Sequence, residues 1–286
     1  NDPRYDVVGV LVRNPEKPRD VPCPPELFTA DADALLSRKP DIVLEALSEG
    51  EAGHALIRKA LEAGCDVASA NKQAVSRDPA GLQALAYQKG RRVFWSASVG
   101  GGSPMIETVR AARAAGEVAG FEAVLNGTVN FMLERLGDGA AFAEALADAR
   151  AAGFAEEDPS ADLEGLDAAA KVRLLAYEAF GVSPPVDTVP RDHLSEQTVA
   201  APGVRQIGAC RKDGEALSPS VKLTADHNDP LFSSLNGEGN ALKVWTADGR
   251  VWRCRGRGAG RWATTESIMA DLAEIVRARR ADAGLN

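Results

Sequence analysis

The first 125 residues predict an α/β fold built on a parallel, doubly wound sheet. Short β-branched runs alternate there with amphipathic segments, and each amphipathic segment ends in glycine. The runs are residues 7–13, 41–47, 66–70, 92–98 and 121–126, and the segments are residues 54–64, 80–90 and 104–116. Strands that alternate with helices pair in parallel, so the sequence predicts a Rossmann-like sheet with its ligand at the carboxyl ends of the strands.

Residues at these strand ends are the first candidates for a nucleotide site. They are Arg13, Leu47-Ser48, Asn71-Lys72 and Ser98. Arg13 follows the first run, where a dinucleotide fold places the residue that meets the adenosine ribose, and an arginine there suits a 2′-phosphate. With Lys17 nearby, the sequence favours NADPH, although NADH and a purely surface arginine stay open as alternatives.

The phosphate-binding turn expected of such a fold does not precede Arg13. A strand followed by G-x-G-x-x-G would place a helix N-terminus against the pyrophosphate, and the 286 residues contain none upstream of this position. We therefore expect the sheet to lack its usual first strand, either because the sequence is a fragment or because the protein lacks this cradle. The glycines at 100–102 and 256–260 lack the strand-to-helix context that could replace it.

Composition excludes several classes of function. The chain has 33 basic and 41 acidic residues, a formal net charge of −8 and no dense basic block, which argues against a nucleic-acid partner. It contains no run of about 18 apolar residues and no signal-like leader, so we expect a cytoplasmic protein without a membrane partner. Its four cysteines are far apart, as reduced thiols would be.

A dense acidic stretch between residues 153 and 171 runs into a helix expected to be buried. Asp167 and Lys171 are four residues apart, so their side chains project from one face of that helix. A solvated surface pair is the alternative. Because the helix is rich in alanine and leucine, and a buried ion pair is a poor source of stability, the pattern favours acid/base chemistry instead.

Five stretches, in order, resemble the homoserine dehydrogenase family: residues 68–75, 96–106, 126–133, 153–171 and 255–272. The resemblance implies an NAD(P)-dependent oxidoreductase of amino-acid biosynthesis that interconverts L-aspartate 4-semialdehyde and L-homoserine, and a homodimer. It also implies a nucleotide-binding domain over 1–125, a helical segment 258–286 that returns to it, and an α+β substrate and dimerisation domain over 126–257. For that second domain we expect a mixed sheet backed by helices, with Trp245 and Trp252 on one core-facing hairpin face.

The resemblance also implies roles for charged residues. Lys171 is placed to exchange a proton with the substrate oxygen, and Lys72 to polarise the carbonyl beside the nicotinamide. Glu156 and Asp167 are expected to accept the substrate ammonium, and Asp162 to shape the loop or hold Lys171.

Further positions follow from the same resemblance. Residues expected to meet the substrate carboxylate or the cofactor at a turn are Asn126, Gly127 and Thr128. Residues expected to let the backbone approach the nucleotide are Gly153, Gly258 and Ala259. Oxygens expected to reach a sodium ion belong to Val99, Gly101 and Ser103, but Ser96 replaces the acidic residue with which that motif begins.

Two other functions stay open from the residues. A related reductase of another small amino-acid aldehyde could hold the same ammonium and aldehyde groups, since the motifs do not fix the chain length. A non-catalytic homologue would account for the absent glycine-rich turn. Activity on aspartate semialdehyde and on its one-carbon-longer homologue separates these readings.

Overall fold

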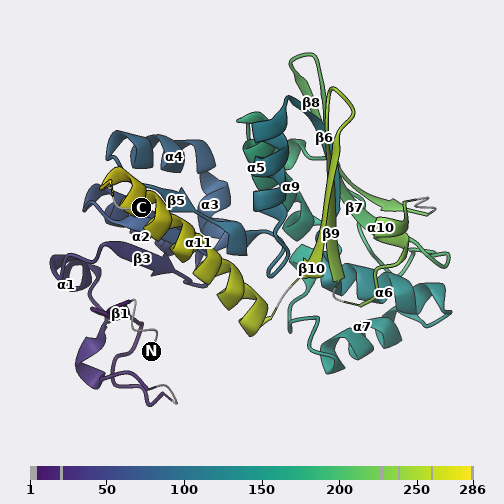
Figure 1. Ribbon diagram of the computed structural model, residues 1–286. Helices are drawn as coiled ribbons and strands as arrows, with labels where there is room; N and C mark the ends of the chain where they lie inside the picture. The colour runs from purple at the N-terminus through teal and green to yellow at the C-terminus, as the bar shows by residue number, and fades with distance from the viewer. Residues whose placement is uncertain (1–4, 20–21, 226–228, 238, 259, 285–286) are drawn as a thin grey trace.

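The computed structural model describes residues 5–19, 22–225, 229–237, 239–258 and 260–284. A small parallel sheet with its helices forms one part, and a larger antiparallel sheet with its helices forms the other (Figure 1). The long helix α11 (Arg261–Asp282) follows the larger sheet in sequence and returns to the parallel part. Within the described ranges, no helix is both long and apolar enough to cross a membrane.

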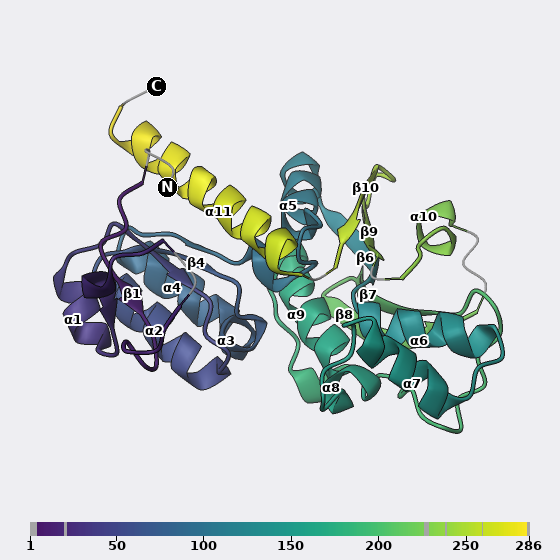
Figure 2. The same cartoon turned by 90° about the horizontal axis from the view of Figure 1, so that it is seen from below.

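The parallel part confirms the predicted α/β class. Its sheet has the order β3-β4-β5, with β3 at Ile42–Glu45, β4 at Asp66–Ser69 and β5 at Val93–Phe94. One face is covered by α2 (Gly50–Glu62), α3 (Lys72–Arg77) and α4 (Pro79–Gln88), and α11 crosses the other face (Figure 2). Apolar residues from these layers, including Ile57, Leu61, Val67 and Leu82, are fully buried and form its core.

The first predicted strand is much shorter than residues 7–13. Only β1 (Val10–Leu11) forms, and it pairs in parallel with β2 (Phe28–Thr29), beside η1 (Pro25–Leu27) and α1 (Ala32–Ser37). Among the described strands β1 pairs only with β2, and β3 only with β4. A cavity of about 910 Å³ separates β1 from β3, as expected for a sheet without its usual first strand.

The second part is built on a five-stranded sheet of order β10-β9-β6-β7-β8. Its strands are β6 (Val118–Val124), β7 (Arg205–Asp213), β8 (Ala216–Thr224), β9 (Gly239–Thr246) and β10 (Val251–Arg257). All neighbours are antiparallel, so the prediction of a mixed sheet is wrong. The assignment of run 121–126 to the parallel series is also wrong, because β6 pairs with β7 and β9.

Trp245 and Trp252 lie on opposite faces of the β9-β10 hairpin, contrary to prediction. The register pairs Trp252 with Val244 and Trp245 with Val251, and successive residues of a strand point to opposite faces. Trp252 packs against the main core, whereas Arg211 and Lys243 contact the ring of Trp245 on the other face.

All helices of the second part except α10 lie on one face of this sheet, and α10 packs on the other face against Val124, Ile207 and Ala241. The helices of the second part are α5 (Met105–Ala115), α6 (Gly127–Gly137), α7 (Phe142–Ala151), α8 (Ser160–Leu163), α9 (Leu166–Phe180) and α10 (Pro230–Ser233), with the 3₁₀ turn η3 (Val186–Thr188). The central helix α9 contacts α5 and strands β6, β7 and β8. It ends at Gly181, whose φ of 74° is the left-handed conformation that glycine adopts without strain.

Helix α11 is fastened to the parallel part by polar contacts at two levels. Arg279 binds Asp66, which is fully buried, and Asp41. Nearer the start of the helix, the carboxylate of Asp271 accepts a 2.9 Å hydrogen bond from Ser96 N in η2 (Ser96–Ser98). Asp271 is 1% exposed, and this burial raises the pKa of its carboxyl from 3.8 to about 7, although the Ser96 hydrogen bond opposes the shift.

Asp271 should therefore make stability depend on pH. Because its folded-state pKa is raised, the native state binds more protons, so its contribution is complete below about pH 4 and is lost as the pH rises to about 7. In the wild type, this loss of unfolding free energy is about 4 kcal/mol over that interval. We expect Asp271→Asn, which keeps an acceptor for Ser96 N, to remove this pH dependence. Urea titrations of the wild type and Asp271→Asn between about pH 4 and pH 7 measure the free energy of unfolding. The same pH dependence in both proteins would contradict the prediction.

Candidate active site

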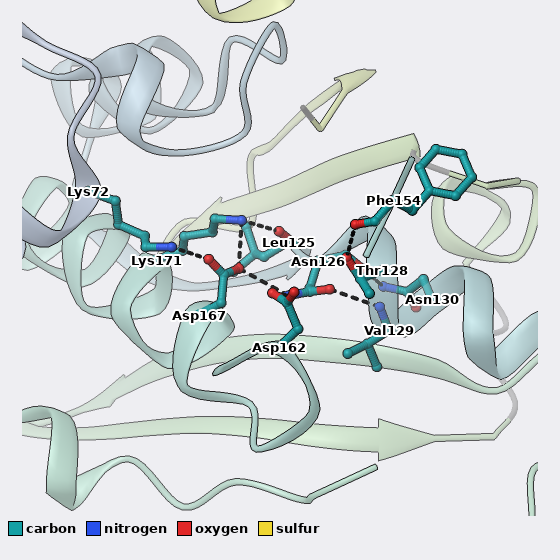
Figure 3. A network of polar contacts seen from close by, with 10 residues as sticks. All are labelled: Lys72, Leu125, Asn126, Thr128, Val129, Asn130, Phe154, Asp162, Asp167 and Lys171. Carbon is teal, nitrogen blue, oxygen red and sulfur yellow. Dashed lines mark hydrogen bonds and ion pairs between the residues drawn. The ribbon is translucent and has the colours of Figure 1, made fainter. Parts of the chain in front are cut away.

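A single carboxylate lies between two lysines where the two parts meet (Figure 3). Asp167 stands in the first turn of α9, and Lys171 follows it by one turn on the same face. Lys171 Nζ lies 2.7 Å from Asp167 Oδ2, and Lys72 Nζ contacts Asp167 Oδ1 from the start of α3. The surface-pair alternative is excluded, since the three side chains are only 12–23% exposed.

The lysines keep Asp167 ionised. Burial raises the pKa of this carboxyl, but the charges and hydrogen bonds of Lys171 and Lys72 outweigh burial and hold the pKa well below its ordinary value. Lys171 Nζ also donates a 2.7 Å hydrogen bond to the carbonyl of Leu125. The cluster thus has two cationic groups and one fixed anion.

Asn126 connects this cluster to the acidic loop. Its Nδ2 donates to Asp162 Oδ1 at 2.7 Å and to Asp167 Oδ2 at 3.1 Å, while its Oδ1 accepts from Val129 N and caps α6. Burial and the nearby Asp167 charge raise the pKa of Asp162. Asp162 is therefore the carboxylate of this group that more readily takes a proton.

The remaining predicted substrate residues divide into two groups. Gly127 begins α6, and Thr128 donates a 2.6 Å hydrogen bond to Phe154 O, so the turn after Asn126 lies against the loop that follows α7. Glu156 lies exposed on that loop, and in the described part of the chain no hydrogen bond or ion pair joins it to the cluster. The structure brings Asn126, Asp162, Asp167 and both lysines together but leaves Glu156 at the surface.

Several residues predicted to hold a nucleotide lie at the carboxyl ends of the parallel strands, which form the predicted nucleotide edge. Asn71 caps α3 by accepting from Ala74 N, Leu47 N donates to Glu45, and Ser98 Oγ donates to Ser69 O. Ser48 is exposed at the same edge. Sequence reasoning missed two members of this group, Glu45 and Ser69, although a carboxylate inside a buried run was a usable signal for the first.

Arg13 and Lys17 lie on the surface beyond β1. Arg13 makes a 3.1 Å ion pair with Glu49, and its side chain is 86% exposed. Lys17 is also exposed. Both cations can reach a ligand from this side, but Glu49 competes for Arg13.

The predicted close-approach positions differ in their surroundings. Gly153 has a φ of 78° and open space around it. A Cβ at Gly258 would lie 2.5 Å from the Asn240 side chain, so only glycine fits there. Ala259 lies outside the described residues.

The sodium loop fits a cation poorly. Gly101 O accepts a hydrogen bond from Ser267, Ser96 provides no carboxylate, and Ser103 Oγ is buried without a partner among the described atoms. Val99 is buried in the main core. Sodium stays a prediction of the resemblance, and no step is assigned to it.

Comparison with known proteins identifies the family. The family model "Homoserine dehydrogenase" matches residues 104–273, and "Homoserine dehydrogenase, NAD binding domain" matches residues 2–95. The chain belongs to the homoserine dehydrogenase family. The homoserine dehydrogenases of Synechocystis sp. and Pseudomonas aeruginosa are each 33% identical to it, over 95% and 97% of this chain. The chain spans 66% of the length of each, just under two thirds.

Solved homoserine dehydrogenase structures share the fold. The enzyme from Thiobacillus denitrificans superposes with a TM-score of 0.82 at 28% identity, over 89% of this chain and 62% of that one. A hyperthermophilic archaeal homoserine dehydrogenase in complex with NADPH superposes with a TM-score of 0.76 at 26% identity, over 86% and 74%. The family resemblance seen in the sequence is therefore confirmed.

Proposed function

We propose that the chain interconverts L-aspartate 4-semialdehyde and L-homoserine by NAD(P)-dependent hydride transfer. The observation that carries this proposal is the convergence of Lys72 and Lys171, from different parts of the fold, on the buried carboxylate of Asp167. One lysine stands at the strand ends where a nicotinamide cofactor belongs, and the other stands on the helix beside the acidic loop. Family membership supports the same reaction.

The residues at the parallel strand ends suit a nicotinamide cofactor. Leu47, Ser48, Asn71 and Ser98 would hold it. Gly258, whose missing side chain makes room for Asn240, would approach it through its backbone. When bound, the cofactor supplies the hydride, and the protein orients it.

Lys171 is suited to move the proton. An ammonium has three N–H donors, and two of those on Lys171 go to Leu125 O and Asp167, which leaves one for the substrate oxygen. Lys72 would stabilise the negative charge that develops on that oxygen. The substrate ammonium requires acceptors, which Asp167 and Asp162 supply inside the cluster. Glu156 would join them only after its exposed loop moved toward the cluster, and the turn Asn126-Gly127-Thr128 would face the substrate carboxylate.

A homodimer is also part of the proposal. Most helices cover one face of the antiparallel sheet, and α10 packs on part of the opposite face. That opposite face also carries Ala209, Ser220, Trp245 and Val251 by its register. Val251 is 40% exposed there, and the edge strand β10 has no partner beyond β9 among the described strands. A second copy would cover this face. The division at residue 125 and a cytoplasmic location stay predictions.

The proposed role of Lys171 is tested by Lys171→Ala. We expect kcat for aspartate semialdehyde reduction to fall by about 10²–10⁴-fold while NADPH affinity stays nearly unchanged, because only the proton donor is lost. Asp167→Ala should raise the substrate KM and lower kcat together, since Asp167 both accepts the ammonium and orients Lys171. Stopped-flow hydride transfer measures these effects, with Lys59→Ala on the surface of α2 as control. A folded Lys171→Ala protein that keeps more than about a tenth of kcat would transfer the role to Lys72.

Cofactor preference is tested at Arg13. A charge-assisted pair with a 2′-phosphate contributes about 1.5–3 kcal/mol, so we expect Arg13→Ala to reduce the NADPH to NADH ratio of kcat/KM by about 10–100-fold. Glu49→Ala should increase the ratio, because it frees Arg13 from its ion pair. Arg58→Ala on the surface of α2 is the matched control. If neither Arg13→Ala nor Glu49→Ala changes this ratio, Arg13 does not bind the 2′-phosphate.

The homodimer is tested by light scattering at micromolar concentration. We expect a mass of twice the 30.1 kDa of one chain. Trp245→Glu should shift the mass toward one chain, because it places a charge in the proposed contact. A wild-type mass near that of one chain would refute the dimer.

A further inference from the structure

A buried carboxylate stands at the carboxyl end of β3 without a basic partner. Glu45 is 1% exposed, and in the described residues no lysine, arginine or histidine forms an ion pair with it. It accepts three hydrogen bonds instead: Leu47 N at 2.8 Å, Asn71 Nδ2 at 3.2 Å and Ser69 Oγ at 2.6 Å. Burial of a carboxylate without a cationic partner lowers the stability of the folded protein. We therefore expect a role of Glu45 other than stability.

These hydrogen bonds connect the ends of all three parallel strands. Glu45 ends β3, Ser69 ends β4, and Ser98 in η2 follows β5 and donates to Ser69 O at 3.0 Å. Ser69 is fully buried and Ser98 is 5% exposed. The network therefore fixes the edge at which a parallel sheet binds its ligand.

Asn71 carries the network toward the reacting groups. Its Nδ2 donates to Glu45 and to Glu49 O, while its Oδ1 accepts from Ala74 N at the start of α3. Lys72, the next residue, contacts Asp167. A Cβ at Gly53 would lie 2.5 Å from Asn71 Nδ2 and 2.8 Å from Glu45 Oε1. The backbone of α2 therefore packs directly against the hydrogen bond between Asn71 and Glu45.

We infer that Glu45 is a positioning residue for both the cofactor and Lys72. Its carboxylate holds the turn at Leu47 and the amide of Asn71 in one arrangement, so the nucleotide edge and the first turn of α3 are set together. The inference rests on the proposed hydride transfer, since the residues that Glu45 orients are those assigned to the cofactor and the carbonyl.

The experiment compares Glu45→Ala with Glu45→Gln. Alanine removes all three acceptor contacts, and we expect NADPH binding, measured by its fluorescence, to weaken about ten-fold and kcat to fall. Glutamine keeps an oxygen for Leu47 N and Asn71, while its amide can donate to the Ser69 hydroxyl, so it should recover most of the affinity. Should alanine prevent folding, Ser69→Ala removes one contact and is expected to shift affinity in the same direction.

Glu178→Gln is the matched control. Glu178 is also buried, but it pairs with Arg110 between α5 and α9, away from the nucleotide edge. We expect this change to lower Tm without changing NADPH affinity. Equal NADPH affinities for the wild type, Glu45→Ala and Ser69→Ala would overturn the inference. It would also be overturned if Glu178→Gln, which is expected to lower only Tm, weakened NADPH binding as much as Glu45→Ala does.

Hydrogen exchange of the protein without cofactor separates this inference from the proposed function. Glu45→Ala should speed exchange at Leu47 N and Ala74 N, whether or not the chain turns over aspartate semialdehyde. Unchanged exchange at both amides overturns the positioning role. A wild-type chain that binds no NADPH overturns the proposed function instead.

Discussion

The carboxylate of Asp167 is the constraint on which the site depends. It is ionised inside the protein only because Lys171 and Lys72 approach it from two sides, and one of those lysines belongs to the parallel part. The Lys72–Asp167 contact also places the start of α3 against α9. One ion pair therefore joins the two parts of the fold and helps keep Asp167 ionised.

Each lysine reaches this carboxylate through local structure. Lys171 is one helical turn from Asp167, and an alanine-rich face lets α9 pack closely under it. Lys72 depends on the Asn71 cap, which fixes where α3 begins, and Asn126 performs a similar task for α6 while it donates to Asp167. Two asparagine caps thus orient helices around one anion.

The sequence predicted local relations well and long-range relations poorly. The Asp167–Lys171 pair follows from helical spacing, and the structure places both residues on α9. The run 121–126 was misassigned because β-branched composition reports a strand but not its partner, and here the partners are more than 80 residues farther along the chain. Glu45 was missed although a carboxylate inside a buried run was a signal, because its hydrogen-bond partner Ser69 lies on the neighbouring strand. Glu156 lies in a motif of the family, yet its side chain is exposed, because a motif position does not fix where a loop side chain points.

The space between β1 and β3 has a consequence for how the protein behaves in solution. On the side of β3 away from β4, no described strand occupies the hydrogen-bonding edge, and Leu44 is 46% exposed beside it. An open apolar edge of this kind is a template for intermolecular pairing. A strand that paired with β3 on this side would cover Leu44 and remove that template, at a sheet edge away from the lysines that contact Asp167.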